Sequence, residues 1–387
     1  MHYLTFIAYI GLMETNFDVL IIGGGLAGLT AAIHLSQKKL KVVLVEKSSF
    51  PRHKVCGEYI SNEILPYLKW LGADISELQP TNISQFRFST HNGKTAEAKL
   101  PLGGFGISRY ALDEFLYQKA LVNNCSILKA NVTDVSFYND VFKVTTSEQI
   151  LTAKIVLGAF GKRSNVDQFL DRSFFHKKSP WLAVKAHYSG NLDASLVELH
   201  NFEGGYCGVS KVENNIINIC YLCDYATFKK YKNIEEYQQN VLYKNQHLKF
   251  VFENSTLLFD KPLTISQISF DKKKAVENHI IMIGDTAGLI HPLCGNGMAM
   301  AMHSAKIASE ILLEYFSDTE MNRDLLEKKY SKEWQNYFGK RIIMGRILAR
   351  LLTHKTITTL FVALVASFPG LLRTIIKQTH GKPIAIQ

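Results

Sequence analysis

The sequence predicts an α/β protein in which a parallel βαβ unit, an inserted antiparallel sheet and a helical C-terminal tail follow one another. Three observations predict this order. Two short apolar runs at 18–22 and 41–46 enclose a glycine-rich turn and a segment with helical spacing, as buried parallel strands and their crossover helix do. Long alternating runs begin near residue 171 and are typical of antiparallel strands. Helical spacing then dominates from about residue 297 to residue 377.

The same patterns place the other elements. Helical spacing predicts helices at 29–36, 62–71, 110–121 and 297–316, with at least two more before residue 377. A fully buried run at 279–283 returns after the alternating segment, which indicates that this segment is inserted into the first domain. Apolar or alternating runs predict further strands at 86–90, 95–99, near 127, 132–137, 141–146, 155–157, 181–188, 196–200, 206–212 and 216–223.

A G-x-G-x-x-G motif lies between the first strand and the first helix and is formed by Gly23, Gly25 and Gly28. These glycines permit a tight turn, close approach of the backbone to a pyrophosphate, and close helix packing. The helix N-terminus offers N–H donors to phosphate, and Glu46 at the end of the second strand can bind a ribose. A tight turn without a ligand would leave Glu46 unexplained. The motif therefore predicts a Rossmann-like, dinucleotide-binding domain.

A second loop with a glycine-rich sequence follows the buried run at 279–283. Asp285 comes directly after that strand, and Pro292, Gly295 and Gly297 lead into a helix. An Asp at a strand end can bind the hydroxyls of a sugar-alcohol chain, and a glycine-lined helix start can present N–H donors to an anionic ring edge. The alternative is a glycine-rich turn with a helix cap. We interpret the loop as a second cofactor-facing segment.

Size and composition restrict the class of protein. With 387 residues, of which 47% are apolar and 20% charged, the chain predicts two packed domains and excludes disorder. Six scattered cysteines argue against a disulfide scaffold and favour a reducing cytoplasm. Cys220 and Cys223 lie three apart on a predicted strand and thus point to opposite faces, which disfavours a zinc or dithiol site. Nucleic-acid binding has only the net charge in its favour.

The two motifs, together with 51–61 (PRHKVCGEYIS) and 108–116 (SRYALDEFL), resemble the geranylgeranyl reductase branch of the FAD-dependent flavoproteins related to p-hydroxybenzoate hydroxylase. The resemblance covers roughly residues 17 to 320. It implies that the Rossmann-like domain binds FAD and that NADH or NADPH supplies the electrons. Phe160 replaces the acid of the family's G-A-D-G-like element, which leaves the hydride delivery from NAD(P)H open. The tryptophan-rich signature of flavin halogenases is absent from the sequence, which argues against halogenation.

The resemblance also implies a set of FAD-binding residues. The glycine turn with Glu46 would hold the ADP part, Asp285 the ribitol, and the loop 292–298 would lie beside the isoalloxazine. Val132 falls where the family has an adenine contact. The predicted cofactor-binding residues are Gly23, Gly25, Leu26, Ala27, Gly28, Glu46, Lys47, Arg52, Gly57, Arg109, Val132, Asp285, Pro292, Gly295, Gly297 and Met298, and no metal ligands are predicted.

Cys56 and His291 are the two candidate catalytic residues. Cys56 lies among Arg52, His53 and Lys54, and cationic neighbours favour a thiolate; the alternative is a small buried apolar residue. His291 precedes Pro292 in the flavin-side loop and has an ordinary pKa near neutrality, although such residues often only satisfy a backbone hydrogen bond. Three further residues on alternating strands, His187, His200 and Tyr206, can line a pocket or face the core or solvent.

The resulting domain assignment is discontinuous. Residues 1–12 are apolar but lack the basic region and cleavage site of a signal peptide, and a second start lies at Met13. We expect this doubtful extension to be a wrongly extended start or a loosely held tail. The FAD-binding domain comprises 13–82, 105–170 and 271–320, the substrate domain 83–104 and 171–270, and the C-terminal helical region 321–387.

Three functions fit these features. The first is an FAD enzyme that reduces carbon–carbon double bonds of a large apolar substrate, isoprenoid or polyketide-like, by hydride transfer from reduced flavin. The second is an FAD-dependent monooxygenase that hydroxylates or epoxidises an aromatic compound or an alkene. The third is a non-catalytic nucleotide- or lipid-binding protein. The cysteine–glycine motif and the apolar tail favour reduction.

The net charge of +10 is concentrated in the tail. Eight of the 44 basic residues follow Glu333, after which the sequence has no acidic residue, and the other 36 face 34 acidic residues. The tail also contains an uncharged stretch at 356–372, interrupted by Pro369 and at the short limit for spanning a bilayer. Its helices can be buried over an apolar pocket or lie on an anionic membrane surface. We expect a cytoplasmic protein with a peripheral membrane contact through this tail.

Overall fold

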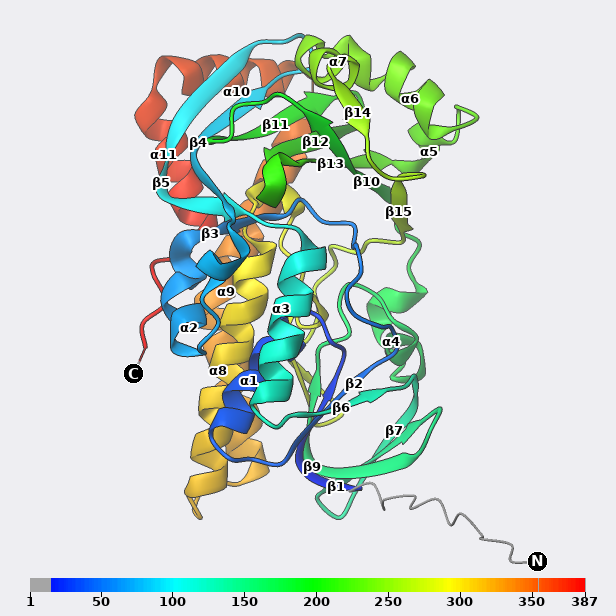
Figure 1. Ribbon diagram of the computed structural model, residues 1–387, viewed down its shortest axis with the longest axis vertical. Helices are drawn as coiled ribbons and strands as arrows, with labels where there is room; N and C mark the ends of the chain where they lie inside the picture. The colour runs from blue at the N-terminus through cyan, green and yellow to red at the C-terminus, as the bar shows by residue number, and fades with distance from the viewer. Residues whose placement is uncertain (1–14, 354, 387) are drawn as a thin grey trace, which may run out of the picture.

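The computed structural model describes residues 15–353 and 355–386 and contains two large sheets that follow each other along the long axis of the molecule (Figure 1). The expectation about residues 1–12 and the start at Met13 therefore lies outside the described residues. The mixed α/β architecture with a C-terminal helical region is the predicted fold class.

The first sheet has eight strands and its main path runs β16-β17-β9-β1-β2-β6. Its central strands β1 (Asn16–Ile22), β2 (Val42–Glu46) and β9 (Ile150–Gly158) pair in parallel, and β2 is buried along its whole length. The helices α1 (Leu26–Gln37), α3 (Arg109–Val122) and α8 (Gly297–Ser317) pack next to this sheet. Burial on both faces explains the apolar runs at 19–22 in β1 and 42–45 in β2.

The edges of the first sheet are completed by shorter strands. β6 (Ser126–Lys129) pairs with β2, and β17 (Ile280–Met282) pairs in parallel with β9. The buried run after the alternating segment thus returns to the first sheet, as predicted. A meander of β7 (Val132–Tyr138) and β8 (Val141–Thr146) joins β9, and β16 (Val276–Glu277) pairs with β17.

The second sheet has nine strands and runs β14-β10-β13-β12-β11-β4-β5-β3, with β15 paired to β10. All its pairings are antiparallel except β4 with β11, which are parallel because a long connection through the first sheet separates them. The strand β3 belongs to this second sheet, although it lies in the range 13–82 that the sequence assigns to the FAD-binding domain. The strands are β3 (Tyr59–Ser61), β4 (Thr81–Ser89), β5 (Thr95–Gly106), β10 (Trp181–Gly190), β11 (Leu196–Phe202), β12 (Gly205–Lys211), β13 (Ile217–Asp224), β14 (Ser255–Leu257) and β15 (Leu263–Ser266).

Three short helices, α5 (Tyr225–Phe228), α6 (Ile234–Asn240) and α7 (Gln246–Glu253), follow β13 and were not predicted. Apolar residues of α6 and α7 form a core with one face of β10, β12 and β13. Cys223 belongs to this core, whereas Cys220 lines the cavity described below. The predicted opposite orientation of the two cysteines is confirmed.

The tail forms α9 (Arg323–Thr353), α10 (Lys355–Ser367) and α11 (Pro369–Thr379), so the helical region has three pieces. The helices α10 and α11 pack against β5 and form a core with the other face of the second sheet (Figure 1). The uncharged stretch 356–372 is divided because Pro369 begins α11. Among the described residues, no single helix has the length and hydropathy of a membrane span; α9 and α10 together pass that test but are bent by 114°.

Two other short helices are α2 (Leu65–Trp70) after β3 and α4 (Asn165–Phe169) after β9, and single 3₁₀ turns occur in the connections. α2 falls inside the predicted helix at 62–71, whose first residues form a separate 3₁₀ turn, Asn62–Ile64. The helix is shortened because Pro66 lies at its first turn and fits only there.

Candidate cofactor and substrate site

A continuous cavity of about 740 Å³ lies between the two sheets and is bounded by segments far apart in the sequence. It collects sixteen of the eighteen residues predicted for the site; Gly28 and His291 do not line it. Lining residues from the predicted set are Gly23, Gly25, Leu26, Ala27, Glu46, Lys47, Arg52, Cys56, Gly57, Arg109, Val132, Asp285, Pro292, Gly295, Gly297 and Met298.

The glycine turn between β1 and α1 forms one end of the cavity. Gly23 has φ +108°, and a Cβ there would lie 2.5 Å from the Ala159 carbonyl oxygen. A Cβ on Gly28 would lie 2.0 Å from the Gly23 carbonyl oxygen, so this glycine serves helix packing. A Cβ on Gly25 would meet no protein atom closer than Arg109 Nη2 at 4.0 Å. The open space at Gly25, beside a helix start without a side-chain cap, is a cradle for a phosphate group.

Glu46 holds this turn in place. Its carboxylate accepts hydrogen bonds from the backbone N–H groups of Gly24 (2.8 Å) and Ser48 (2.9 Å), and Arg52 Nη2 lies 3.0 Å away. Because Glu46 is nearly buried and lines the cavity, a ribose bound there would meet its oxygens. Val132 lines the same end of the cavity, and its carbonyl accepts a bond from Asn165 Nδ2 (3.1 Å).

A buried cluster of two cations and one acid lies beside the glycine turn. Asp113 accepts from Arg109 Nε and Nη2 (2.7 and 2.8 Å) and pairs with Lys54 Nζ at 2.7 Å. Burial would raise the pKa of Asp113, but the two cations hold it below its ordinary value. Burial, aided by Arg109, lowers the pKa of Lys54 to about 8. The cluster leaves one excess positive charge, which complements a pyrophosphate.

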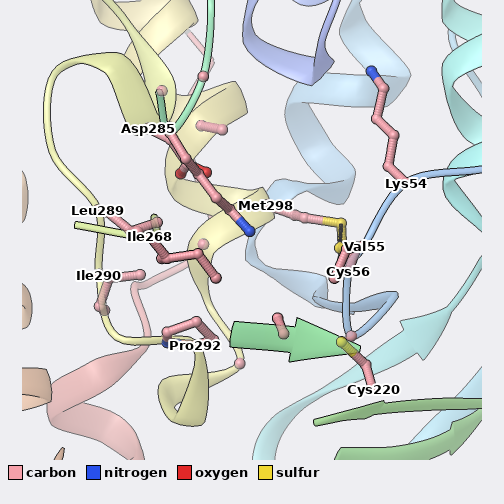
Figure 2. A pocket seen from close by; sticks show the side chains of 18 of the residues that line it. Lys54, Val55, Cys56, Cys220, Ile268, Asp285, Leu289, Ile290, Pro292 and Met298 are labelled. Atoms are coloured by element: carbon pink, nitrogen blue, oxygen red, sulfur yellow. Dashed lines mark hydrogen bonds between the residues drawn. The ribbon is translucent and has the colours of Figure 1, made fainter. Parts of the chain in front are cut away.

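The other half of the cofactor part is formed by Asp285, the loop 292–298 and the segment around Cys56. Lys273 Nζ fixes the Asp285 turn by donating to the carbonyls of Asp285 and Lys162, both at 2.9 Å. Cys56 Sγ lies 3.5 Å from Met298 Sδ, and Figure 2 shows Cys56 beside Met298, with Cys220 on the neighbouring strand. A Cβ on Gly57 would meet nothing within 4 Å, so a planar ring can approach this backbone.

The three basic residues expected to act on Cys56 have other partners. Arg52 pairs with Glu46 and Lys54 with Asp113. The His53 ring packs against aromatic neighbours, and burial lowers its pKa to about 4. Two of the three basic neighbours expected to favour a thiolate are therefore paired with carboxylates, and a catalytic role for Cys56 stays a prediction.

His291 lies behind the cavity wall. Its ring stacks on Phe270 with centroids 4.5 Å apart and approaches Tyr206 and Trp181. Burial lowers its pKa to about 4, so the ring is neutral at physiological pH. His291 is thus packed among aromatic rings and is not one of the residues that line the cavity, and an acid–base role for it stays a prediction.

Glu58 is a buried residue of the site that the sequence analysis did not identify. It lines the cavity, and its carboxylate accepts from the Arg109 N–H (2.8 Å), Lys185 Nζ (3.0 Å) and His187 Nε2 (2.6 Å). Burial would raise the pKa of Glu58, but His187 and Lys185 hold it below its ordinary value. This cluster connects the Cys56 segment to β10. The sequence offered one signal for this cluster: Lys185 and His187 interrupt an otherwise apolar strand.

The other residues left open by the sequence have different places. Tyr206 lines the cavity, whereas His200 is fully buried and hydrogen-bonds to Ser89 (2.8 Å) and Glu198 (2.9 Å). Phe160, which replaces the family's acid, lines the cavity. Arg163, three residues after Phe160, donates to the Phe175 carbonyl at 2.6 Å and lies over the Phe175 ring.

The cavity continues beyond Cys56 into an apolar chamber. Its floor comes from the second sheet, and its roof comes from the C-terminal helices α9, α10 and α11. The apolar lining is Phe86, Phe88, Leu100, Ala183, Val197, Leu199, Leu222, Ile265, Ile268, Leu289, Leu293, Leu348, Leu351, Leu352, Phe361, Val365, Leu372, Ile375 and Ile376. A water-poor chamber of this kind fits a large apolar molecule.

Comparisons with known proteins agree with this site. The FAD binding domain model matches residues 18–54, and the squalene epoxidase model matches residues 238–364. The chain is 26% identical to a digeranylgeranylglycerophospholipid reductase of Methanosarcina acetivorans, over 87% of this chain and 84% of the relative. It is 24% identical to conditioned medium factor receptor 1 of Dictyostelium discoideum, over 88% of this chain and 71% of that protein.

Solved structures share the fold at low identity. A geranylgeranyl bacteriochlorophyll reductase-like protein from Thermoplasma acidophilum has a TM-score of 0.73 at 19% identity and covers 94% of this chain and 97% of its own. The flavin-dependent brominase Bmp2 has a TM-score of 0.78 at 18% identity and covers 94% and 93%. The halogenase PltM, solved with phloroglucinol and FAD, has a TM-score of 0.73 at 16% identity and covers 88% and 78%.

The fold and the cavity define an FAD-dependent oxidoreductase. The open cradle at Gly25, the ribose-facing Glu46 and the excess positive charge beside them fit the ADP part of FAD. The chain is similar to the geranylgeranyl reductase-like branch of the FAD-dependent flavoproteins related to p-hydroxybenzoate hydroxylase, as the relatives and the shared fold indicate.

Proposed function

We propose that the protein reduces carbon–carbon double bonds of a large apolar substrate, isoprenoid or polyketide-like, with NADH or NADPH as the electron donor. The observation that carries this proposal is the continuity of the FAD-binding half of the cavity with the apolar chamber. The reductase relatives support it.

In this function, the side chains of the chamber bind the substrate by burial of apolar surface and exclude water. Reduced FAD, when bound, supplies the hydride that saturates the double bond. Cys56 and Met298 lie where the two halves of the cavity meet, and we place the reacting double bond against them. Glu58 holds the Cys56 segment against β10 through Lys185 and His187.

An anaerobic single-turnover assay tests the proposal. The FAD-loaded protein is reduced with dithionite and mixed with prenyl and polyene compounds of increasing length, and the products are analysed by mass spectrometry. We expect a mass gain of two hydrogens per reduced bond together with reoxidation of the flavin absorbance. Unchanged compounds and a stable reduced flavin across the series would contradict the proposal.

A second candidate is oxygenation of an alkene or aromatic compound, favoured by the match of the squalene epoxidase model to residues 238–364. This segment contains α9 and most of α10, two of the three helices that cover the chamber. The two reactions differ in their need for oxygen. Substrate-coupled oxygen uptake with NADH or NADPH would support the oxygenase, and an equal yield under argon would support the reductase.

A further inference from the structure

Helix α10 has two apolar faces. On one side Phe361 and Val365 line the chamber, and Val362 packs in the core below it. On the other side Ile357, Leu360 and Leu364 are 43%, 66% and 48% exposed. Their spacing of three and four residues puts them on one stripe of the helix. A helix that covers a pocket in a water-soluble protein needs an apolar face only toward that pocket. Packing within the molecule therefore does not explain the outer stripe.

Exposed apolar side chains continue onto the neighbouring helices. Phe368, just before α11, is 60% exposed, and Leu371 in α11 is 38% exposed. On α9, Ile343 and Ile347 are 54% and 46% exposed and are four residues apart. The three helices pack on one another, and α10 and α11 lie at the outer edge of the molecule beside β5 (Figure 1). An exposed apolar patch of this extent marks an interaction site.

The charges of the tail after Glu333 have one sign. Lys340, Arg373 and Lys377 are exposed and have no ion pair among the described residues. The sequence after Glu333 contains no acidic residue, so nothing within the tail neutralises them. By contrast, Arg341 is held by Glu63 at 3.1 Å and Arg346 by the Phe270 carbonyl at 3.0 Å, both inside the molecule. Exposed leucines and phenylalanine with a basic rim complement an anionic lipid surface.

We propose that the outer faces of α9, α10 and α11 dock on an anionic lipid surface, with the stripe Ile357, Leu360 and Leu364 inserted among the acyl chains. Since the inner face of α10 lines the chamber, docking places a single helix between the lipid and the substrate space. The protein is then a peripheral membrane protein, and an apolar substrate reaches the chamber past α10 without crossing water. This proposal concerns binding and is independent of which reaction the flavin performs.

Vesicle flotation of the FAD-loaded full-length protein tests the proposal. Vesicles of equimolar phosphatidylcholine and phosphatidylglycerol are compared with vesicles of phosphatidylcholine alone. We expect binding to the anionic vesicles that falls at least tenfold in 0.5 M salt, because Lys and Arg contribute roughly fivefold each near such a surface at low salt. The variant Leu360→Ser with Leu364→Ser should reduce the bound fraction at least tenfold.

Matched controls keep the test specific. The variant Leu257→Ser with Leu258→Ser removes two leucines of similar exposure, 37% and 49%, from the region of β14 and should bind like the wild type. The charge variant Arg373→Gln with Lys377→Gln should lose binding to anionic vesicles, whereas Lys229→Gln with Lys230→Gln, on the exposed turn after α5, should keep it. The FAD content and Tm of each variant verify that it is folded.

Two results would overturn the proposal. Equal binding of the α10 and β14 leucine variants would show that the outer stripe is not the contact. Absence of vesicle binding by the wild type, together with a dimer in solution that Leu360→Ser with Leu364→Ser dissociates, would assign the surface to a second copy of the chain.

Discussion

At the level of single residues, the site depends on how each charge is paired. The segment 52–58 contains three basic residues, one cysteine and one buried acid, and each basic side chain has a partner outside this segment. Cys56 is left at the junction of the two halves of the cavity, next to Met298. The position of the thiol in the cavity therefore sets it apart from the other cysteines. The paired neighbours of Cys56 hold the backbone around it.

Replacement of Cys56 by Ser tests this position. We expect turnover to fall at least tenfold with an unchanged FAD content, because the thiol lies beside the space for the reacting bond while the phosphate and ribose contacts that hold FAD are at Gly25 and Glu46. Steady-state kinetics and the flavin absorbance measure the two quantities. Cys220→Ser, which removes another thiol of the same cavity, is the control; an unaltered rate for Cys56→Ser would remove this residue from the mechanism.

Replacement of Glu58 by Gln tests the buried cluster. The change leaves Lys185 buried without its carboxylate, so the free energy of unfolding should fall by about 3 kcal/mol. Because the pKa of Glu58 is held below its ordinary value of 4.5, its contribution is complete above that pH and is lost as the pH falls through the lower, folded-state value.

Urea unfolding at pH 7 and pH 4 measures this effect. The difference between wild type and Glu58→Gln should be large at pH 7 and smaller below pH 4, and Glu320→Gln on the surface should show no such dependence. An equal difference at both pH values would mean that the carboxylate charge of Glu58 does not stabilise the fold.

At the level of elements, the turn between β1 and α1 shows that the glycines of one motif have different tasks. Gly23 and Gly28 are required by protein contacts, since a Cβ at either would collide with a backbone oxygen. Gly25 is required only by a ligand, because its missing Cβ leaves open space at the helix start. The structure is needed to separate these tasks, because the motif has the same residue at each of these positions.

The pair Gly25→Ala and Gly28→Ala tests this difference. Gly25→Ala should keep the Tm of the FAD-free protein, because Gly25 has φ −88° and alanine fits there, but the Kd for FAD should rise at least tenfold. Gly28→Ala should lower the Tm of the FAD-free protein. Calorimetry and FAD titration measure these outcomes, and full FAD affinity in Gly25→Ala would contradict the assignment of the phosphate cradle.

At the level of the whole molecule, the chamber exists only because the second sheet and the tail helices close on each other. Its apolar lining comes from strands before residue 110, strands of the inserted segment and helices after residue 320. These parts meet at the FAD-binding loops of the first sheet. The arrangement of the domains thus sets the volume of the substrate space, and this volume limits the size of the substrate.

Two adjacent residues of α10 test the chamber. Val365 is 2% exposed and lines the cavity, whereas Leu364 is 48% exposed on the outer face. Val365→Trp should reduce kcat/KM for long apolar substrates at least tenfold by filling the chamber, with FAD content and reduction by dithionite unchanged. Leu364→Trp, assayed with detergent-dispersed substrate, should behave like the wild type. Equal kinetics of both variants would place the substrate elsewhere.

The sequence predicted most strands and the glycine turn, because these depend on local periodicity and on a motif with a fixed spacing. The resemblance to a flavoprotein family implied most of the sixteen lining residues. The sequence missed α5, α6 and α7, since short helices of four to eight residues have too little periodicity to be distinguished from the neighbouring strands. It also missed Glu58, whose partners Lys185 and His187 are on a strand more than a hundred residues away.

Local patterns were enough to predict a Rossmann-like, dinucleotide-binding domain, an inserted sheet and a basic, apolar tail, because buried parallel strands, glycine turns and charge distribution depend on neighbouring residues. The packing of the complete chain was needed to show that His291 lies among aromatic rings, that Lys54 pairs with Asp113, and that α10 is apolar on both sides. Each of these depends on contacts between distant segments, and pairing and burial are set by the packing of the complete chain.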